Sequence, residues 1–195
     1  MFLVVIISYV IGSIPTAYIM GRLLKGIDIR DHGSRNVGAT NVFRVVGRGP
    51  GILTLALDIL KGFIVVFLLG YFTSGPNPEL VKIVGGFFVI AGHNWTVFLR
   101  FKGGKGVATS VGVFLALAPV PTAIAFLVFA LVFVPSKKVS PGSIIGALVF
   151  PFLVYSFKET VETLLFASIV SFVIIVNHIP NIKRLVKGTE QKIIN

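Results

Sequence analysis

The sequence contains no cysteine, which excludes a thiol nucleophile, a thiolate metal site and disulfide bonds. Acidic residues are also scarce, with 7 Asp and Glu against 18 Lys and Arg. No polar stretch holds paired carboxylates, and the patterns Gly-x-Ser-x-Gly, His-Glu-x-x-His and His-x4-Asp are all absent. The potential metal ligands do not cluster. A carboxylate-based hydrolase and a metalloenzyme are therefore disfavoured, and we expect neither a metal nor a cofactor.

Long polar stretches are missing as well, because 55% of the residues are hydrophobic and the mean hydropathy is +0.95. Apolar runs of about 17–25 residues can cross a bilayer, and several lie end to end here. The sequence therefore predicts an all-α polytopic membrane protein in which residues 1–195 form a single domain. The expected spans are residues 2–21, 51–72, 81–99, 106–119, 120–135, 141–157 and 161–179.

The fourth and fifth of these segments are short and form either two short spans or one re-entrant pair. The distribution of the net charge of +11 favours two spans, because the basic residues then alternate correctly between the two sides. One side holds only Lys82 and Lys158. The other side, predicted to be cytoplasmic, holds Arg22, Lys25, Arg30, Arg35, Arg44, Arg48, Arg100, Lys102, Lys105, Lys137, Lys138, Lys183, Arg184, Lys187 and Lys192.

Seven spans then place the N-terminus outside and the C-terminus in the cytoplasm. The basic residues flank hydrophobic segments and form no continuous stripe or tail, so nucleic acid is not an expected partner. Three polar blocks interrupt the hydrophobic chain, and all fall on the predicted cytoplasmic side. They are the first polar block (residues 33–44), the second polar block (residues 101–109) and the third polar block (residues 178–185).

The first polar block predicts a short helix at the membrane interface, near residues 36–46, with Ser34 as its N-cap. One face of this helix is apolar, and the other carries Asn36, Thr40 and Arg44, with Asn41 beside them. This polar face either meets water or binds a ligand. Its amides, hydroxyl and single guanidinium favour binding, since solvated faces are usually rich in Lys and Glu.

The second polar block contains Lys102, Gly103, Gly104, Lys105 and Gly106 directly before a predicted helix. Glycine lets backbone N–H groups approach an anion closely, and a helix N-terminus adds partial positive charge. The spacing differs from that of a Walker A loop. The alternative is a flexible basic turn, but phosphate binding explains the pattern better.

The third polar block contains His178, Asn181 and Lys183, and Pro180 argues against a continuous helix there. His178 is either a general base or a structural residue at the end of a span. Within the spans, Asp58 and Lys61 lie three residues apart and can form an ion pair on one helix face. We expect this pair to be structural.

The three polar blocks closely resemble those of the membrane glycerol-3-phosphate acyltransferases that use acyl phosphate as donor, the PlsY family of bacterial phospholipid synthesis. The matching stretches are Gly12–Gly47, Gly92–Thr109 and His178–Lys192, in the family's order and spacing. The chain has Arg35 where members commonly have glycine, and Thr96 where a proline is common.

The resemblance implies acyl transfer from acyl phosphate to the 1-hydroxyl of glycerol 3-phosphate, giving lysophosphatidate and phosphate. It implies a multi-pass protein of the bacterial inner membrane that works beside lipid, with its site facing the cytoplasm. The implied catalytic residues are Ser34, Arg44, Lys105, His178 and Asn181. The implied substrate-binding residues are Asn36, Thr40, Asn41, Lys102, Gly103, Gly104, Gly106 and Lys183, and Glu190 is expected to anchor the tail by pairing with a basic residue.

The general base stays open at this stage. His178 can accept the hydroxyl proton, or a phosphate oxygen of the donor can accept it. A covalent intermediate through Ser34 ranks last, because no base lies beside it in the sequence. A small membrane transporter for phosphorylated anions is the alternative function, and a lipid-binding scaffold without turnover is a third.

Overall fold

The computed structural model describes residues 1–73 and 76–193, and these residues form helices joined by turns without any strand. The helices are α1 (Phe2–Ser13), α2 (Thr16–Lys25), η1 (Ile29–Asp31), α3 (Ala39–Val45), α4 (Arg48–Phe72), α5 (Pro78–Asn94), η2 (Val97–Leu99), α6 (Val107–Leu117), α7 (Pro119–Ser136), α8 (Val139–Ser156), α9 (Val161–Asn177) and α10 (Ile179–Val186).

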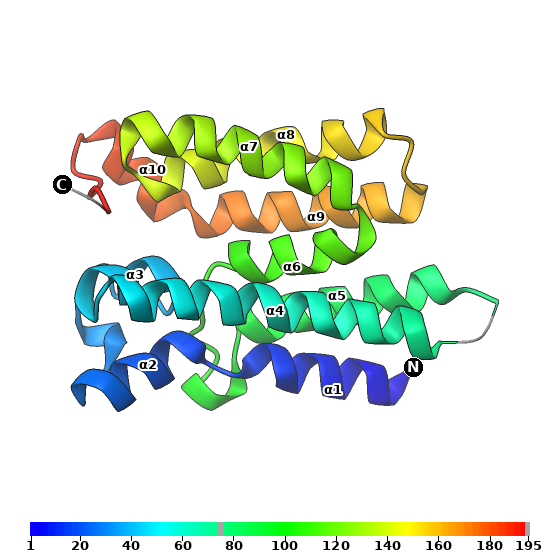
Figure 1. Ribbon diagram of the computed structural model, residues 1–195, viewed down its shortest axis with the longest axis horizontal. Helices are drawn as coiled ribbons and strands as arrows, with labels where there is room; N and C mark the ends of the chain where they lie inside the picture. The colour runs from blue at the N-terminus through cyan, green and yellow to red at the C-terminus, as the bar shows by residue number, and fades with distance from the viewer. Residues whose placement is uncertain (74–75, 194–195) are drawn as a thin grey trace. The chain divides into compact units, whose positions relative to one another are not determined.

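Contacts group the chain into two compact units, unit 1 (Met1–Leu117) and unit 2 (Ala118–Asn195). In unit 1, α1 packs along α5, and α4 packs against both α5 and α6 (Figure 1). In unit 2, α8 packs against both α7 and α9, and α10 continues from α9 after a bend of 52°. The expectation of one domain stays a prediction.

Each expected hydrophobic segment is helical, which confirms the all-α membrane class. Within the described residues, 5 helical stretches are long and apolar enough to span a membrane, or 6 if α9 and α10 form one bent span. The 5 stretches are Phe2–Lys25, Arg48–Phe72, Pro78–Leu99, Pro119–Ser136 and Val139–Ser156. Helix α6 is apolar but shorter. The number of spans and their orientation stay predictions.

Two segments differ from the sequence-based expectation. The fifth is not short, because α7 has 18 residues. The first is not one continuous helix, because it breaks between α1 and α2 at Ile14 and Pro15. A residue that precedes proline is disfavoured in the α conformation, and Ile14 is accordingly extended, with ψ of 112°. We refer to Ile14 and Pro15 as the α1–α2 corner.

Helices α4 and α6 approach closely through glycine. A side chain built on Gly112 would overlap the carbonyl oxygen of Ile59, and one built on Gly62 would overlap the carbonyl oxygen of Thr109. Small residues of this kind allow the backbones of membrane helices to come into contact. The pairing of α4 with α6 therefore depends on the absence of side chains at two positions.

We expect Gly112→Ala to destabilise unit 1 by about 1–3 kcal/mol, because the added methyl group overlaps backbone atoms of α4 that cannot move aside. Gly146→Ala is the matched control in a helix interior, since its nearest neighbour, the carbonyl oxygen of Ala125, would lie at an ordinary 3.5 Å. The measurement is the Tm of the detergent-solubilised protein. Equal Tm values for the two variants would contradict the close approach of α4 and α6.

Candidate functional site

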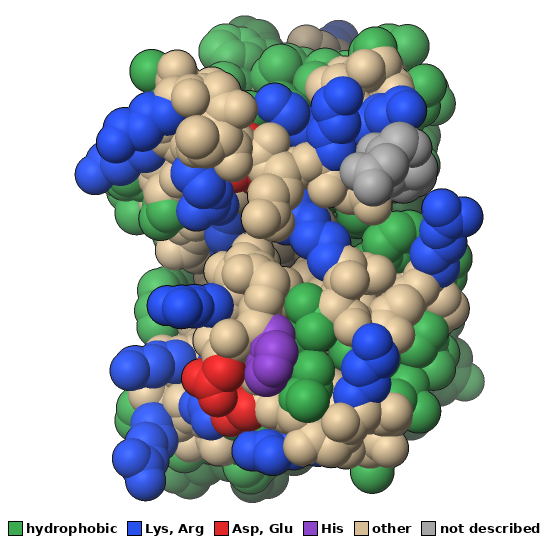
Figure 2. All heavy atoms as spheres, turned by 90° about the vertical axis from the view of Figure 1, so that its left-hand side faces the viewer, with side chains coloured by type: hydrophobic (Ala, Val, Ile, Leu, Met, Phe, Trp, Pro, Cys, Tyr) green, Lys and Arg blue, Asp and Glu red, His purple; other side chains and the backbone are tan. Residues whose placement is uncertain are grey.

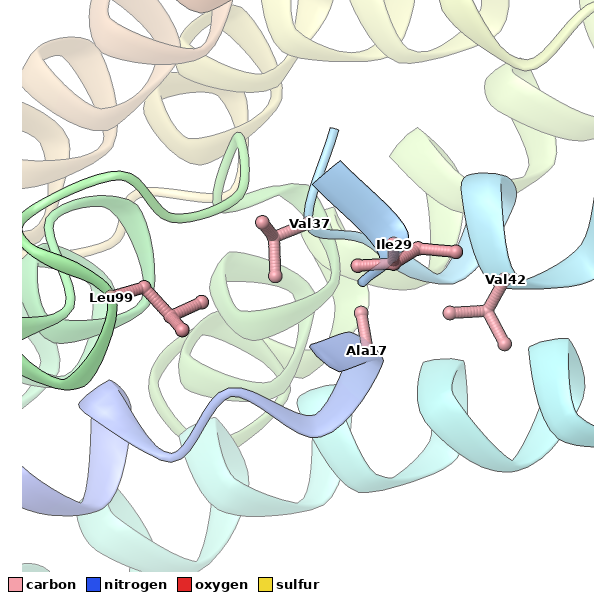
Figure 3. Close-up of a cluster of buried hydrophobic side chains, with 5 residues drawn as sticks. All are labelled: Ala17, Ile29, Val37, Val42 and Leu99. Carbon is pink, nitrogen blue, oxygen red and sulfur yellow. The ribbon is translucent and has the colours of Figure 1, made fainter. Parts of the chain in front are cut away.

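A small apolar core joins the loops at one end of unit 1. Figure 3 shows side chains from five segments converging there. They are Ala17 of α2, Ile29 of η1, Val37 of the first polar block, Val42 of α3 and Leu99 of η2. This core holds the first polar block against the segment that leads into the second. Figure 2 shows Lys and Arg side chains on this end of unit 1.

The helix of the first polar block starts later than the sequence predicted. Helix α3 begins at Ala39, its N-cap is Gly38, and Ser34 does not cap it. Residues before it form a turn with positive φ at Gly33 (58°) and Arg35 (61°). This backbone conformation favours glycine, which explains why an arginine at position 35 is a departure from the family pattern. The prediction of Ser34 as the N-cap of this helix is wrong, because Ser34 lies in the turn four residues before Gly38. The backbone N–H of Ser34 donates instead to Oδ1 of Asn41 at 2.9 Å.

Asn41 organises this turn. Its side chain is fully buried, and its Nδ2 atom lies 3.0–3.1 Å from the carbonyl oxygens of Ile29, His32 and Asn36. With the Ser34 amide on its Oδ1, both ends of the Asn41 amide bond to the protein backbone. Asn41 therefore positions the backbone of the first polar block, and its expected contact with substrate stays a prediction.

Of the other polar residues of the first block, Arg35 is exposed, whereas Ser34, Asn36, Thr40 and Arg44 are half-buried and keep part of their surface accessible. Thr40 and Arg44 lie four residues apart on α3, so they share a face of this helix as predicted. Asn36 does not lie on that face, because it precedes the helix and belongs to the turn. Ser34 is also in the turn.

The second polar block is held by the end of α5. The N–H group of Gly103 donates to the carbonyl oxygen of Asn94 at 3.1 Å, and that of Gly104 donates to the carbonyl oxygen of His93 at 3.0 Å. In this conformation both amides are engaged by the end of α5, and the expected contact of these amides with a phosphate stays a prediction. Glycine is needed there because a Cβ atom would overlap the backbone of His93 at position 103 and the His93 ring at position 104.

The rest of the second block keeps the features that suit an anion. Lys102 is exposed and Lys105 is half-buried. Gly106 has φ of 84° and directly precedes α6, so the predicted helix after the block is confirmed. The first-turn N–H groups of a helix lack intrahelical acceptors, and the helix N-terminus carries partial positive charge.

The structure brings the first and second polar blocks together. A Cβ atom built on Gly104 would lie 2.7 Å from the carbonyl oxygen of Val37, in the middle of the first block. Segments more than sixty residues apart in the sequence therefore touch through their backbones. The cationic residues of both blocks consequently belong to one end of unit 1.

A surface ion pair near this end was not predicted from the sequence. Arg30 donates to the carboxylate of Asp28 through Nε at 3.0 Å and Nη2 at 2.7 Å. The hydrogen bond from Arg30 lowers the pKa of Asp28 to about 2, so this carboxylate stays charged. In the sequence, this ion pair is indicated only by the spacing Asp-x-Arg of Asp28 and Arg30. That spacing alone is too unspecific to predict an ion pair.

In unit 2, the third polar block is organised by the buried carboxylate of Glu190. Asn181 Nδ2 donates to Glu190 Oε1 at 2.6 Å, and Arg184 Nε donates to Glu190 Oε2 at 2.7 Å. Ser140 of α8 also donates to Oε1 and in turn accepts from Asn181 at 2.7 Å. The prediction that Glu190 pairs with a basic residue is confirmed, whereas the role of Ser140 was missed.

Burial alone would raise the pKa of Glu190. The hydrogen bonds from Ser140, Asn181 and Arg184 outweigh burial and lower this pKa below its ordinary value of 4.5. The lowered pKa means that the ionised carboxylate stabilises the contact between the tail and α8. We call this contact, formed by Ser140, Asn181, Arg184 and Glu190, the tail clasp.

His178 lies at the bend between α9 and α10 and is buried. Its Nδ1 atom is 2.8 Å from the carbonyl oxygen of Ile174, which can only accept a hydrogen bond. The ring proton of the neutral imidazole is therefore assigned to Nδ1, and Nε2 is the nitrogen with the lone pair. Lys183 follows on α10 and is exposed. The break predicted at Pro180 is confirmed, since α9 ends at Asn177 and α10 begins at Ile179.

The Asp58–Lys61 ion pair predicted inside a span is also confirmed, with Lys61 Nζ at 2.7 Å from Asp58 Oδ1. The structure adds His93, whose Nδ1 atom lies 3.0 Å from Lys61 Nζ. No local spacing indicates this contact, because Lys61 and His93 lie on different helices, α4 and α5.

Comparisons with known proteins agree on one family. A sequence profile described as glycerol-3-phosphate acyltransferase matches residues 2–188. Glycerol-3-phosphate acyltransferase 2 of Moorella thermoacetica is 47% identical, over 98% of this chain and 96% of its own length. The glycerol-3-phosphate acyltransferase of Endomicrobium trichonymphae is 44% identical, over 98% of this chain and 94% of its own length.

Two solved structures are also similar to the chain. The crystal structure of PlsY (YgiH), an integral membrane glycerol 3-phosphate acyltransferase, in its glycerol 3-phosphate form has a TM-score of 0.92 and 37% identity. Its lysophosphatidic acid form has a TM-score of 0.88 and the same identity. Each comparison covers 98% of this chain and 94% of the other.

The tail clasp predicts a pH-dependent contact. Because the pKa of Glu190 is lowered below 4.5 in the folded protein, its stabilisation is complete above pH 4.5 and is lost as the pH falls through the lowered value. The protection factors of the amides in residues 186–193, which correct for the intrinsic pH dependence of exchange, should therefore fall on acidification below that range. Glu190→Gln should show faster exchange already at pH 7, and its exchange protection should no longer change with acidification.

Glu162→Gln, an exposed change in the first turn of α9, is the matched control and should retain the pH dependence of the wild type. The same pH dependence in Glu190→Gln would assign the effect to another group.

Proposed function

Because the chain belongs to the glycerol-3-phosphate acyltransferase family, we propose that it transfers an acyl group from acyl phosphate to the 1-hydroxyl of sn-glycerol 3-phosphate. The products are 1-acylglycerol 3-phosphate and inorganic phosphate. Acylation of glycerol 3-phosphate agrees with the names of the relatives, and the acyl-phosphate donor is our proposal.

The observation that carries this proposal is the contact between the first and second polar blocks in unit 1. It gathers Arg44, Lys102 and Lys105 at one end of a membrane-embedded helical unit. Both proposed substrates carry phosphate, and the donor also carries a long acyl chain. A cationic end on a lipid-facing unit suits this combination, because the phosphates stay in the polar layer while the chain enters lipid.

The chemical step needs little from the protein besides positioning and charge. The 1-hydroxyl oxygen of glycerol 3-phosphate attacks the acyl carbon, and the new C–O bond forms as the bond from that carbon to the phosphate oxygen breaks. The phosphate leaves with the electron pair of that bond, and the hydroxyl proton moves to a base. Because acyl phosphate is already activated, orientation and stabilisation of negative charge can supply most of the acceleration.

The proposed roles follow the sequence motifs and take account of the contacts described above. Lys102 and Lys105, with the N-terminus of α6, are proposed to hold one phosphate, and Arg44 is proposed to hold the other. Ser34, Asn36 and Thr40 are proposed to position the glycerol hydroxyls or to polarise the donor carbonyl. Gly103 and Gly104 allow the second polar block to pack closely against His93. Asn41 holds the backbone of the first polar block, and Asn181 binds Glu190 of the tail.

His178 is proposed to accept the hydroxyl proton at Nε2, since Nδ1 faces the carbonyl oxygen of Ile174. The participation of His178 and Lys183 in the same reaction as unit 1 rests on the sequence motifs. The bacterial inner membrane and a site that faces the cytoplasm are likewise proposed from the charge distribution and the family.

The proposed donor is tested with purified protein, acyl phosphate and glycerol 3-phosphate, in the absence of acyl-CoA and acyl carrier protein. We expect 1-acylglycerol 3-phosphate and inorganic phosphate in equal amounts, and no product when acyl-CoA replaces acyl phosphate. Absence of product would leave transport or a lipid-binding role. A burst of phosphate before glycerol 3-phosphate is added would instead indicate a covalent intermediate.

His178→Ala should lower kcat by about 100-fold or more, the usual contribution of a positioned general base. His32→Ala is the matched control, because His32 is an exposed histidine whose ring contacts only the carbonyl oxygen of Asp28 among the hydrogen bonds of the described residues. It should retain wild-type kcat. A kcat of His178→Ala within a few-fold of wild type would assign the proton to a phosphate oxygen of the donor.

A further inference from the structure

A buried charged network links the membrane-embedded helices of unit 1. Lys61 Nζ lies 2.7 Å from Asp58 Oδ1, 3.0 Å from His93 Nδ1 and 3.2 Å from the carbonyl oxygen of Ile14. Thr16 donates a further hydrogen bond to Asp58 Oδ1 at 2.7 Å. Asp58 is only 1% exposed. The network therefore joins α4, α5 and the α1–α2 corner away from water.

The geometry fixes the orientation of the His93 ring. A lysine ammonium has three N–H donors, and Lys61 has three acceptors around it, one of which is His93 Nδ1. His93 Nδ1 also lies 3.5 Å from Asp58 Oδ1. The contact with Lys61 is shorter and an ammonium can only donate, so Nδ1 is assigned as the acceptor and the ring proton of the neutral imidazole is assigned to Nε2. The Nε2 edge of the ring faces the opposite way, toward the second polar block.

His93 contacts the second polar block in two ways. Its carbonyl oxygen accepts the N–H group of Gly104, and its Nε2 atom lies so close to the Gly104 Cα atom that a Cβ atom would overlap it. The neighbouring carbonyl of Asn94 accepts the N–H group of Gly103. A rotation of the His93 ring would therefore collide with the loop at Gly104. The two carbonyl groups that accept from the loop belong to the backbone and do not turn with the ring.

A buried ion pair is weak evidence for a role in stability. Replacing such a pair by hydrophobic residues of similar volume is often neutral or stabilising, whereas removing one partner alone is strongly destabilising. Stability alone therefore does not account for the two charges inside the span, whereas the contact through His93 connects them to the second polar block.

We propose that Asp58 and Lys61 are positioning residues, which fix the ring of His93 and through it place the segment Gly103–Gly106, so that Lys105 and the N-terminus of α6 can bind phosphate. The assignment of phosphate to this segment rests on the function proposed above. The positioning of the loop itself does not depend on which ligand the loop binds.

The absence of cysteine allows a direct test of loop position. A nitroxide label on Phe101→Cys, an exposed position at the start of the second block, reports the local mobility of the loop. The test variant is Asp58→Leu/Lys61→Met, which removes the network without leaving an unpaired charge. We expect a more mobile label and, in the assay of acyl transfer without the label, a KM for a phosphate substrate raised at least fivefold with kcat changed less than twofold.

The matched control is Glu79→Leu/Lys82→Met, which removes an ion pair of the same i,i+3 spacing at the opposite end of α5. Label mobility and kinetics should equal those of wild type. This control separates the loss of any ion pair from the loss of the one that contacts His93.

His93→Gln provides a second variant if the first does not fold, because it keeps the backbone carbonyl and the Asp58–Lys61 pair but removes the ring. His93→Gln should likewise increase the mobility of the label and raise the KM for a phosphate substrate. Unchanged label mobility in a folded Asp58→Leu/Lys61→Met or His93→Gln protein would overturn the inference. If wild type has no acyltransferase activity, the proposed function fails, but the label still decides whether the network positions the loop.

Discussion

The three hydrogen bonds of the Lys61 ammonium group connect the membrane-embedded part of unit 1 to the loops at its end. A charge in hydrocarbon is costly unless it is paired, so each partner must be held accurately. The partners come from α4, α5 and the α1–α2 corner, and the corner exists because Pro15 interrupts the first helix. One buried cation thereby fixes the mutual arrangement of three segments.

The polar blocks use much of their hydrogen-bonding capacity to hold their own backbone. Asn41 bonds to four backbone groups, and the amides of Gly103 and Gly104 bond to the end of α5. In unit 2, Glu190 plays the same part for the tail. Loops that lack regular structure must satisfy their buried polar groups individually. Rigid loops can then present charged side chains in a fixed arrangement.

The sequence predicted the helical segments, the polar blocks and the Asp58–Lys61 pair, because each depends on local spacing and hydrophobicity. It also predicted that Glu190 anchors the tail. It did not predict the late start of α3 or the engaged amides of Gly103 and Gly104, which depend on partners seven or more residues away. The residues Ser140 and His93 were missed as partners for the same reason. The residue pattern of one helix predicts which side chains share a face of that helix. It does not predict which atoms of another helix contact that face.

The i,i+3 spacing of Asp58 and Lys61 has a consequence for how the chain enters the bilayer during synthesis. Each charge at the centre of a lone helix adds about 2.5–3.5 kcal/mol to the cost of insertion. His93 is made 32 residues after Lys61, whereas Asp58 is made before it on the same helix. The two charges near the centre of α4 thus cancel within the helix itself, and this helix can enter lipid before α5 has been synthesised.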